Sequence, residues 1–276
     1  MSSMERAVAV IFSKNRAMQL DATLRSLFLH GSGLTRMDVR VLYLASSPEH
    51  ERQYQQLLLA YPAVTFIREV QFQKQLMTAI QGYPFLLFLV DDALFVRPFH
   101  FPQIAGTLRQ HPDALGFILG LGTNTSYSYT LNRVQELPAF QTVEHGFLKY
   151  RWAKAKHDFG YPLQVSASLY RADDLLPLLG SFSFANPNTL ELGMARHAKR
   201  YRNSRPSLLI PPQTISFCAP INRVQHVFRN RAGSQHAYPT DKLRELFDQG
   251  YRIDVAALSG FVPNAIHQEV SLRFLR

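Results

Sequence analysis

Apolar runs in the first hundred residues constrain the fold more than any other feature of this chain. They lack polar alternation and cover residues 7–12, 39–44, 64–67 and 85–90. Such runs are typical of strands buried on both faces, as in a parallel sheet. Helix-length segments lie between them, and in one of these Leu20, Leu24, Leu27 and Phe28 fall on one helix face. This alternation predicts an α/β fold with a mostly parallel central sheet flanked by helices.

The remaining elements are expected from the same periodicities. Helices are expected over residues 51–61, 72–80, 101–110, 172–179, 188–200 and around 243–247, and further strands over 115–119 and 165–170. Residues 120–131 are rich in Gly, Ser, Thr, Asn and Tyr, which is typical of a binding loop. Because the chain has neither an obvious linker nor an internal repeat, we expect a single domain over residues 1–276.

The amino-acid composition limits the kinds of partner that the protein is expected to bind and the compartment in which it is expected to work. Thirty Lys and Arg against 20 Asp and Glu give a formal charge of +10, which favours anionic partners such as nucleotides, sugar phosphates or acidic lipid surfaces. The single cysteine, Cys218, excludes an internal disulfide framework and a Cys-rich zinc site. No stretch approaches the roughly 20 apolar residues of a membrane span. We therefore expect a cytoplasmic protein, with peripheral contact with an anionic membrane as a further option.

Two adjacent carboxylates, Asp91 and Asp92, directly follow the most apolar run. Sheets of the predicted kind bind ligands beyond the carboxyl ends of their strands, where these residues are expected. Hard divalent metals take carboxylate ligands, and Mg²⁺ often uses one or two of them together with substrate phosphates. The alternative is a turn in which a carboxylate caps backbone amides. The sequence has neither GxGxxG after the first strand nor GxxxxGK[ST], which argues against a Rossmann dehydrogenase and a P-loop NTPase.

The layout of the chain resembles the Rossmann-like GT-A fold of nucleotide-sugar-dependent glycosyltransferases, family 2-like. Four features carry this resemblance: the first strand, the turn Ser13-Lys14-Asn15-Arg16, the helix after it and the later segment FLVDDALF. The resemblance covers the layout of residues 6–200. It implies a DXD-type motif after the fourth strand that holds Mn²⁺ or Mg²⁺ on the donor diphosphate. Here the motif is an x-D-D variant, so one acidic position is missing. Asp92 is the stronger candidate metal ligand and Asp91 the second.

The same resemblance implies where the nucleotide lies. Ser13, Lys14, Asn15 and Arg16 match the nucleotide-binding loop, and Ser46 lies in the neighbouring loop, which also contacts base or ribose in the family. Ser and Asn can bond a base or ribose, and Lys or Arg a phosphate. The alternative is a polar turn in which Asn15 caps the helix. We thus expect a nucleotide-binding half (1–100), an acceptor half (101–200) and a basic C-terminal extension (201–276).

An inverting transferase needs a carboxylate base to deprotonate the acceptor hydroxyl. Family members often place this acid at the start of a helix, where this chain has Glu191. The alternative is a capping box in which Asn188 is the N-cap and Glu191 folds back. Asp174 and its neighbour Asp173 are rival acids, because they too follow a strand and begin a helix, and helix capping is again the alternative.

Basic and aromatic residues gather later in the chain. Residues 193–240 contain no carboxylate, and their Arg and Lys side chains could stabilise a leaving nucleoside diphosphate. His226 in this stretch could complete a metal shell. A second group suggests an anionic acceptor, such as a phosphorylated lipid or acidic polysaccharide, on an aromatic platform; it comprises Tyr127, Tyr129, Tyr150, Trp152, His145, Lys149, Arg151, Lys154, Lys156 and His157.

Together these patterns predict a metal-dependent glycosyltransferase that moves a sugar from a nucleoside diphosphate sugar to a hydroxyl of a glycan or lipid-linked acceptor. Two alternatives remain. One is a binding protein for anionic glycan or nucleic acid on a degenerate GT-A scaffold, although no sequence motif points to nucleic acid. The other is a nucleotidyltransferase, whose loop after the first strand is usually rich in glycine, unlike SKNRAMQL.

Overall fold

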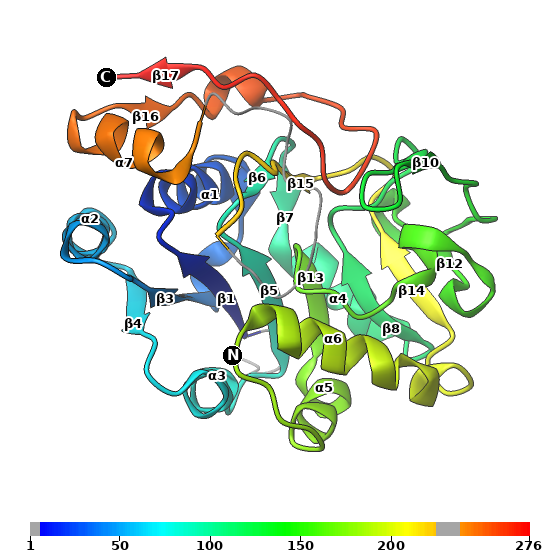
Figure 1. The fold of residues 1–276 in the computed structure, drawn as a ribbon. Helices are drawn as coiled ribbons and strands as arrows, with labels where there is room; N and C mark the ends of the chain where they lie inside the picture. The colour runs from blue at the N-terminus through cyan, green and yellow to red at the C-terminus, as the bar shows by residue number, and fades with distance from the viewer. Residues whose placement is uncertain (1–5, 225–237) are drawn as a thin grey trace.

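The computed structural model describes residues 6–224 and 238–276. Within them the central sheet has nine strands: β1 (Ala7–Lys14), β3 (Met37–Leu44), β4 (Val64–Arg68), β5 (Phe85–Val90), β8 (Ala114–Ile118), β11 (Gln141–Thr142), β12 (Leu148–Tyr150), β13 (Ser168–Arg171) and β14 (Ser207–Ile210). Their spatial order is β11-β12-β14-β8-β13-β5-β1-β3-β4 (Figure 1). The α/β fold expected from the sequence, with a central sheet flanked by helices, is confirmed.

Helices and short strand pairs surround this sheet. The helices are α1 (Ala17–His30), α2 (Pro48–Ala60), α3 (Phe72–Ile80), α4 (Phe101–Gln110), α5 (Ala172–Leu179), α6 (Pro187–His197) and α7 (Thr240–Asp248). The strand pairs are β2 (Gly31–Ser32) with β7 (Phe99–His100), β6 (Ala93–Phe95) with β15 (Ser216–Cys218), β9 (Tyr127–Ser128) with β10 (Arg133–Val134), and β16 (Arg252–Ile253) with β17 (Phe274–Leu275).

The N-terminal strands form the parallel part of the sheet. β1 pairs in parallel with β3 on one side and β5 on the other, and β4 follows β3. β13 enters antiparallel between β5 and β8, so that Arg171 lies opposite Phe85. The carboxyl end of β13 therefore lies at the amino end of β5, on the opposite edge of the sheet from Asp91.

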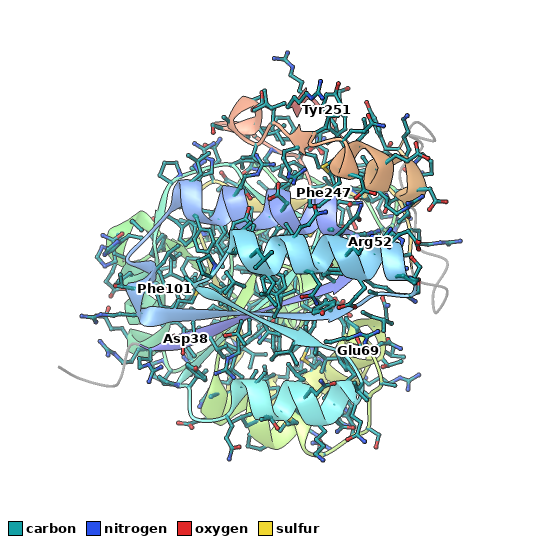
Figure 2. The ribbon with its side chains drawn as sticks, turned by 90° about the vertical axis from the view of Figure 1, so that its left-hand side faces the viewer. Asp38, Arg52, Glu69, Phe101, Phe247 and Tyr251 are labelled. Carbon is teal, nitrogen blue, oxygen red and sulfur yellow. The ribbon has the colours of Figure 1, made fainter. Side chains whose placement is uncertain are left out.

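Both faces of β1 are buried, which explains its lack of polar alternation. Ala9 and Ile11 join the core under α1, α2 and α4, whereas Val10 and Phe12 join the core with α3, α5 and α6. Figure 2, from the side, shows α1 and α2 on one face of the sheet and α3 on the other. Burial on both faces removes the need for polar residues at alternate positions.

Two details differ from the sequence-based expectations. Phe28 does not share the buried face of α1, because 42% of its surface is exposed while Leu20, Leu24 and Leu27 are fully buried. The helix expected over residues 188–200 begins at Pro187 and ends at His197, followed by a short 3-10 turn over Ala198–Tyr201.

The C-terminal residues pack on α1. The Arg25 guanidinium donates to the carbonyl of Ile253 at 2.7 Å, and Leu243 and Phe247 of α7 are buried in the same core as α1. The guanidinium of Arg252 lies 3.7 Å from the centre of the Phe247 ring. None of the helices in the described part of the chain is long and apolar enough to cross a membrane.

Phe247→Ala tests whether α7 belongs to the common core. The ring is 1% exposed, so its removal should lower the free energy of unfolding by about 3–5 kcal/mol, measured by urea denaturation. Leu59→Ala is the control, because Leu59 is 80% exposed and should change stability by less than about 0.5 kcal/mol. Equal small effects of both substitutions would show that α7 adds little to the core.

Candidate functional site

A cavity of about 430 Å³ opens at the carboxyl ends of β1, β3 and β5. The chain leaves β1 toward β3 and later returns to place β5 on the other side of β1, so the cavity lies where the strand order reverses. Such a reversal leaves a crevice above the sheet. The polar residues that line it are Ser13, Lys14, Arg16, Glu69, Asp91, Asp92, Ser166, Asn186, Asn188, Glu191, Asn222, Arg223 and His267.

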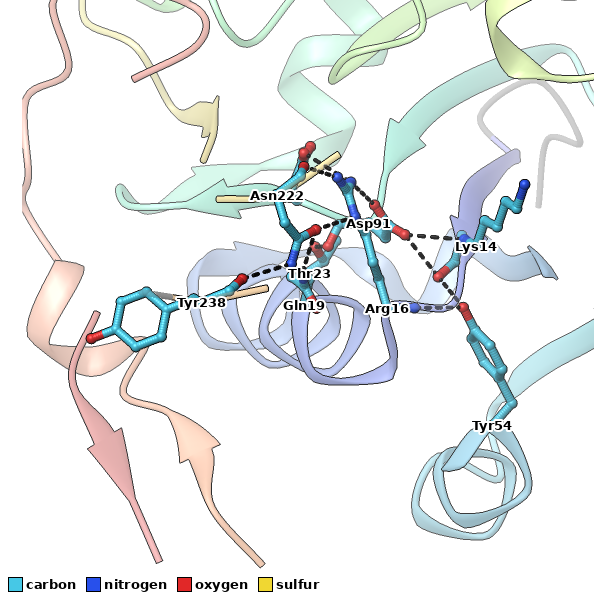
Figure 3. Close-up of polar contacts among 10 residues, drawn as sticks. Lys14, Arg16, Gln19, Thr23, Tyr54, Asp91, Asn222 and Tyr238 are labelled. Carbon is cyan, nitrogen blue, oxygen red and sulfur yellow. Dashed lines mark hydrogen bonds and ion pairs between the residues drawn. The ribbon is translucent and has the colours of Figure 1, made fainter. Parts of the chain in front are cut away.

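Arg16 joins the two carboxylates beneath this cavity. Its Nη1 donates to Asp91 Oδ1 at 3.0 Å and to Asp92 Oδ2 at 3.2 Å (Figure 3). All three side chains are largely buried, with 10%, 5% and 16% of their surface exposed. Burial of a carboxylate without such a partner is costly. The adjacent acids after β5 are thus stabilised by a cation from the loop after β1.

One positively charged guanidinium faces two carboxylates, and this excess of negative charge affects the pKa values of all three groups. Burial raises the pKa of Asp91 to about 6 against the opposing effect of Arg16, and burial also raises the pKa of Asp92. Burial alone would lower the pKa of Arg16, but Asp91 and Asp92 together raise it. When both acids are ionised, the three side chains together carry a net negative charge close to the cavity.

Asp91 is anchored by several donors from the chain itself. Its Oδ2 accepts from Ser13 Oγ at 2.9 Å and from the amide of Lys14 at 3.2 Å. Ser13 Oγ also lies 2.6 Å from the Tyr54 hydroxyl, which accepts from the amide of Arg16 at 3.2 Å (Figure 3). Both oxygens of Asp91 are therefore engaged, and the side chain of Asp92 is the more exposed of the two.

Asn15 and Ser46 connect the two loops beside the cavity. Asn15 Nδ2 donates to Ser46 Oγ at 2.6 Å, and the amide of Ser46 donates to Asn15 Oδ1 at 2.9 Å. Asn15 has a φ of 56°, a left-handed conformation that Asn tolerates better than most residues. The alternative interpretation of Asn15 as helix cap is wrong, since Arg16 occupies the N-cap of α1 without a side-chain capping bond.

Asn222 brings the C-terminal part of the chain to the same site. Its Oδ1 accepts from Arg16 Nε at 2.9 Å and from Gln19 Nε2 at 3.2 Å, and its carbonyl accepts from Arg16 Nη2. Asn222 Nδ2 in turn donates to the carbonyl of Tyr238 at 3.1 Å (Figure 3). Arg16 is thus held in place by residues more than 200 positions away in the sequence.

Glu191 reaches the cavity from α6. The helix is capped by Asn186 and Thr189, which bond each other's backbone amides, so the predicted capping box of Asn188 and Glu191 is wrong. Burial raises the pKa of Glu191 to about 7, while hydrogen bonds from the Val165 amide and the Tyr161 hydroxyl oppose the shift. The carboxyl group is consequently available to exchange a proton near neutral pH.

Gly193 determines how closely α6 approaches its neighbours. A Cβ at this position would lie 2.0 Å from the Phe182 ring, which also stacks on His197 with ring centres 5.3 Å apart. The absence of a side chain at Gly193 lets α6 pack against Phe182. This packing fixes the helix that carries Glu191.

Another cavity of about 430 Å³ adjoins the first. Ser166, Asn188, Glu191 and His267 line both. Its other lining residues are Tyr129, Thr130, Leu131, His157, Asp158, Tyr161, Gln164, Leu192 and Ile266. Glu191 therefore stands at the boundary of two adjoining spaces.

Asp174, the rival catalytic acid, lies elsewhere. It pairs with Arg171 at 2.8 Å and Arg205 at 3.0 Å. Because β13 runs antiparallel to β5, the start of α5 lies at the amino end of β5, on the sheet edge opposite Asp91. The expectation that Asp174 and Asp173 lie at the active edge is wrong, since a strand followed by a helix does not reveal the strand's direction in the sheet.

The predicted basic and aromatic cluster is divided between several places. Tyr150 and Trp152 are buried in the core, and Lys149 pairs with Asp113 at 3.4 Å. Tyr129 and His157 line the second cavity. Arg151, Lys154 and Lys156 line a separate cavity of about 320 Å³ that shares no residue with the other two. The expected aromatic platform with a basic surround is therefore not formed.

The two carboxylates after β5 are the candidate ligands of a divalent metal in this cavity. Asp92 lines the cavity, and the charge of the Asp91–Asp92–Arg16 cluster favours an added cation. Among the described residues no group of three or more His, Cys, Asp and Glu side chains could enclose a metal. His226 lies outside the described residues. The side chains thus fit an ion held by Asp92 together with oxygens of a phosphorylated ligand, as Mg²⁺ is often held.

Several residues of the site were not found from the sequence. Tyr54 and Asn222 contact Arg16, and Ser166 and His267 line both cavities. Tyr54 carried only the periodicity of a buried helix face. Asn222 stood in a recognised basic segment, INRVQHVF, but its bond to Arg16 depends on how the chain folds back, which no local pattern reveals.

The comparisons with known proteins agree with this geometry. No protein-family model matches the sequence. The bifunctional glycosyltransferase pgtA of Dictyostelium discoideum is 28% identical over 256 residues, which covers 82% of this chain and 33% of pgtA. The match thus spans about a third of that relative's length.

A solved structure, TarS 1–349, has a similar architecture. TarS 1–349 of S. aureus superposes with a TM-score of 0.51 at 13% identity, over 78% of this chain and 61% of TarS. The mannosyltransferase PcManGT of Pyrobaculum calidifontis, solved with GDP-Man and Mn²⁺, gives a TM-score of 0.44 at 12% identity, over 76% of this chain and 56% of that protein. The sheet order, the acids after β5 and the likeness to TarS identify the fold of this chain as the GT-A fold of nucleotide-sugar-dependent glycosyltransferases.

Proposed function

We propose that this chain is a glycosyltransferase that moves a sugar from a nucleoside diphosphate sugar to an acceptor hydroxyl. The observation that carries the proposal is the position of Glu191, a half-buried acid that lines both the cavity beside Asp92 and the adjoining one. A transferase needs a donor and an acceptor to meet at a proton-accepting group. The similarity to pgtA, a bifunctional glycosyltransferase, supports the same function.

The donor is proposed to lie in the cavity above β1, β3 and β5. Lys14 and Arg223 line it and can meet phosphate oxygens, whereas Ser13 and Arg16 hold the carboxylates in place. Asn15 and Ser46 fix the two loops against each other, beside the expected position of the base or ribose. A divalent metal bound by Asp92 would offset the negative charge that develops on the leaving diphosphate.

Glu191 is proposed to act as the general base of an inverting reaction. Its carboxylate takes the proton of the acceptor hydroxyl as that oxygen forms a bond to the anomeric carbon. The bond from the anomeric carbon to the diphosphate oxygen breaks, and its electron pair leaves with the nucleoside diphosphate. Tyr161 and the Val165 amide, which donate to Glu191, hold the carboxyl group in position.

The substitutions Asp92→Asn and Asp91→Asn distinguish a role in metal binding from a role in stabilising the fold. Asp92→Asn should leave the fold intact and abolish any metal-dependent rise in melting temperature. Asp91→Asn should lower the free energy of unfolding by about 3 kcal/mol, because it disturbs a buried ion pair. The measurement is a thermal-shift panel of UDP, GDP, CDP and dTDP with Mn²⁺, Mg²⁺ or EDTA. A metal-dependent shift that survives in Asp92→Asn would contradict the metal assignment.

Glu191→Gln tests the base. It should lower kcat about 10²–10⁴-fold while nucleotide binding stays unchanged, measured as transfer of labelled sugar and by calorimetry. Asp173→Asn is the matched control, because Asp173 is an exposed acid in the first turn of α5. Activity of Glu191→Gln close to that of the unchanged protein would exclude Glu191 as the base.

The pH profile provides a separate check of the base. A general base must be ionised, and burial raises the pKa of Glu191 to about 7. We therefore expect kcat/KM to rise with pH through about 7 and to level off above it. The free energy of unfolding changes with pH in the opposite direction. Because the pKa of Glu191 is raised in the folded state, this residue stabilises the fold at low pH, and its contribution is lost as pH rises through about 7. Glu191→Gln should therefore gain stability relative to the unchanged protein at pH 8, measured by urea denaturation.

A further inference from the structure

The second cavity differs in charge from the donor cavity. Lys14, Arg16 and Arg223 line the donor cavity, whereas among the described residues no Lys or Arg lines the second one. This is notable in a chain with a formal charge of +10. Apart from two tyrosines, the ionisable groups of the second cavity are two acids, Asp158 and Glu191, and two histidines. An anion placed there would face carboxyl groups without an Arg or Lys partner.

The acids of this cavity are also poorly suited to bind a cation. Asp158 Oδ1 accepts from Ser128 Oγ at 2.7 Å, and Oδ2 accepts from Gln135 Nε2 at 3.3 Å. Glu191 accepts from Tyr161 and from the backbone. His267 adds little positive charge near neutral pH, because burial lowers its pKa. Since protein donors already engage both acids, few of their lone pairs remain for a cation, and no Lys or Arg of the described lining would attract an anion.

A buried polar group of the cavity lining lacks a hydrogen-bond partner among the described residues. Gln164 is 4% exposed, and its Nε2 has no hydrogen-bond partner among the described residues. Its backbone is fixed, since its amide donates to the Tyr170 hydroxyl at 2.9 Å and that hydroxyl donates to its carbonyl at 2.9 Å. A buried amide donor without a partner costs free energy. A ligand oxygen would remove that cost.

The remaining lining is apolar or aromatic. Leu131, Leu192 and Ile266 lie in the wall together with the rings of Tyr129 and Tyr161. The C–H faces of a sugar ring pack on such surfaces, while its hydroxyl groups both donate and accept. Gln164 supplies a donor and Glu191 an acceptor, and both suit hydroxyl groups.

We propose that the second cavity binds the acceptor as an uncharged sugar, a neutral glycoside whose hydroxyl points at Glu191. This inference rests on the proposed function and adds the substrate class to it. A carboxylate or phosphate in the cavity would also repel the ionised form of Glu191 and keep the base protonated. Of the basic residues that suggested an anionic acceptor from the sequence, Arg151, Lys154 and Lys156 line a different cavity, and His157 alone lines this one.

The experiment uses matched acceptors that differ only at C6. The donors are the common sugar derivatives of the nucleotide that the thermal-shift panel identifies, and transfer is measured to methyl glucoside and methyl galactoside and to the corresponding methyl glucuronide and galacturonide. At least one neutral glycoside should be used, with kcat/KM at least tenfold above that of its uronide. The proposal is overturned if a uronide is the better acceptor of its pair or if neither neutral glycoside accepts the sugar.

Leu131→Lys places a cation in the cavity wall. Because 51% of Leu131 is exposed, the fold should tolerate the change, and the ratio of kcat/KM for uronide over neutral glycoside should rise about tenfold. Leu29→Lys is the control, since Leu29 on α1 is 55% exposed and lines neither cavity. An unchanged ratio in Leu131→Lys, or an equal rise in Leu29→Lys, would overturn the proposal.

Gln164→Leu removes the unpartnered donor while nearly preserving the shape. It should lower kcat/KM for the neutral glycoside about tenfold, leave nucleotide binding unchanged and cause no loss of stability, whereas a purely structural role predicts a lower melting temperature. Absence of nucleotide binding in the unchanged protein would refute the proposed function and this inference with it. Nucleotide binding and transfer with a preference for uronides would refute only the inference.

Discussion

The contact of Arg16 with Asp91 and Asp92 organises the rest of the site. These side chains come from the ends of two neighbouring parallel strands, and each would be costly to bury alone. Together they form a buried group that leaves Asp92 facing the cavity. Asn222 adds the C-terminal residues to the same guanidinium. One cation therefore links the first loop, the acids after β5 and a segment more than 200 residues away.

Glu191 is the second point on which the geometry depends. The cap formed by Asn186 and Thr189 starts α6 early enough to leave the Glu191 side chain out of the capping bonds. Gly193 then lets the helix lie against Phe182. As a result, the same carboxyl group borders the donor cavity and the cavity proposed for the acceptor. Transfer between two substrates needs such a shared group.

Local patterns predicted the parallel half of the fold well, because a strand buried on both faces and an amphipathic helix each leave a signal in consecutive residues. β5 and α4 were predicted to the residue. Asp91 and Asp92 were found for the same reason, as polar residues directly after an apolar strand. The antiparallel direction of β13 leaves no such signal, and Asp174 was therefore expected at the wrong edge.

Contacts between residues far apart in the sequence could not be predicted, for a related reason. Nothing in a single sequence indicates that Asn222 meets Arg16 or that Gln164 lacks a partner, since both facts depend on how distant segments pack. The basic residues around position 150 were expected to act together, but Lys149 pairs with Asp113, and Arg151, Lys154 and Lys156 line a separate cavity, whereas His157 lines the second one. Basic residues that are close together in the sequence therefore need not contribute their charge to the same site.

The separation of charge between the two cavities also bears on the effect of salt. Ions in solution screen attraction between a phosphorylated ligand and cations such as Lys14 and Arg223, which line the donor cavity. An uncharged sugar in a space without Lys or Arg offers nothing comparable to screen. Ionic strength would then act on the two substrates unequally, raising the KM for the nucleotide sugar while the KM for the acceptor stays nearly constant. Salt would thereby become a means of varying the saturation of one substrate while the other stays fixed.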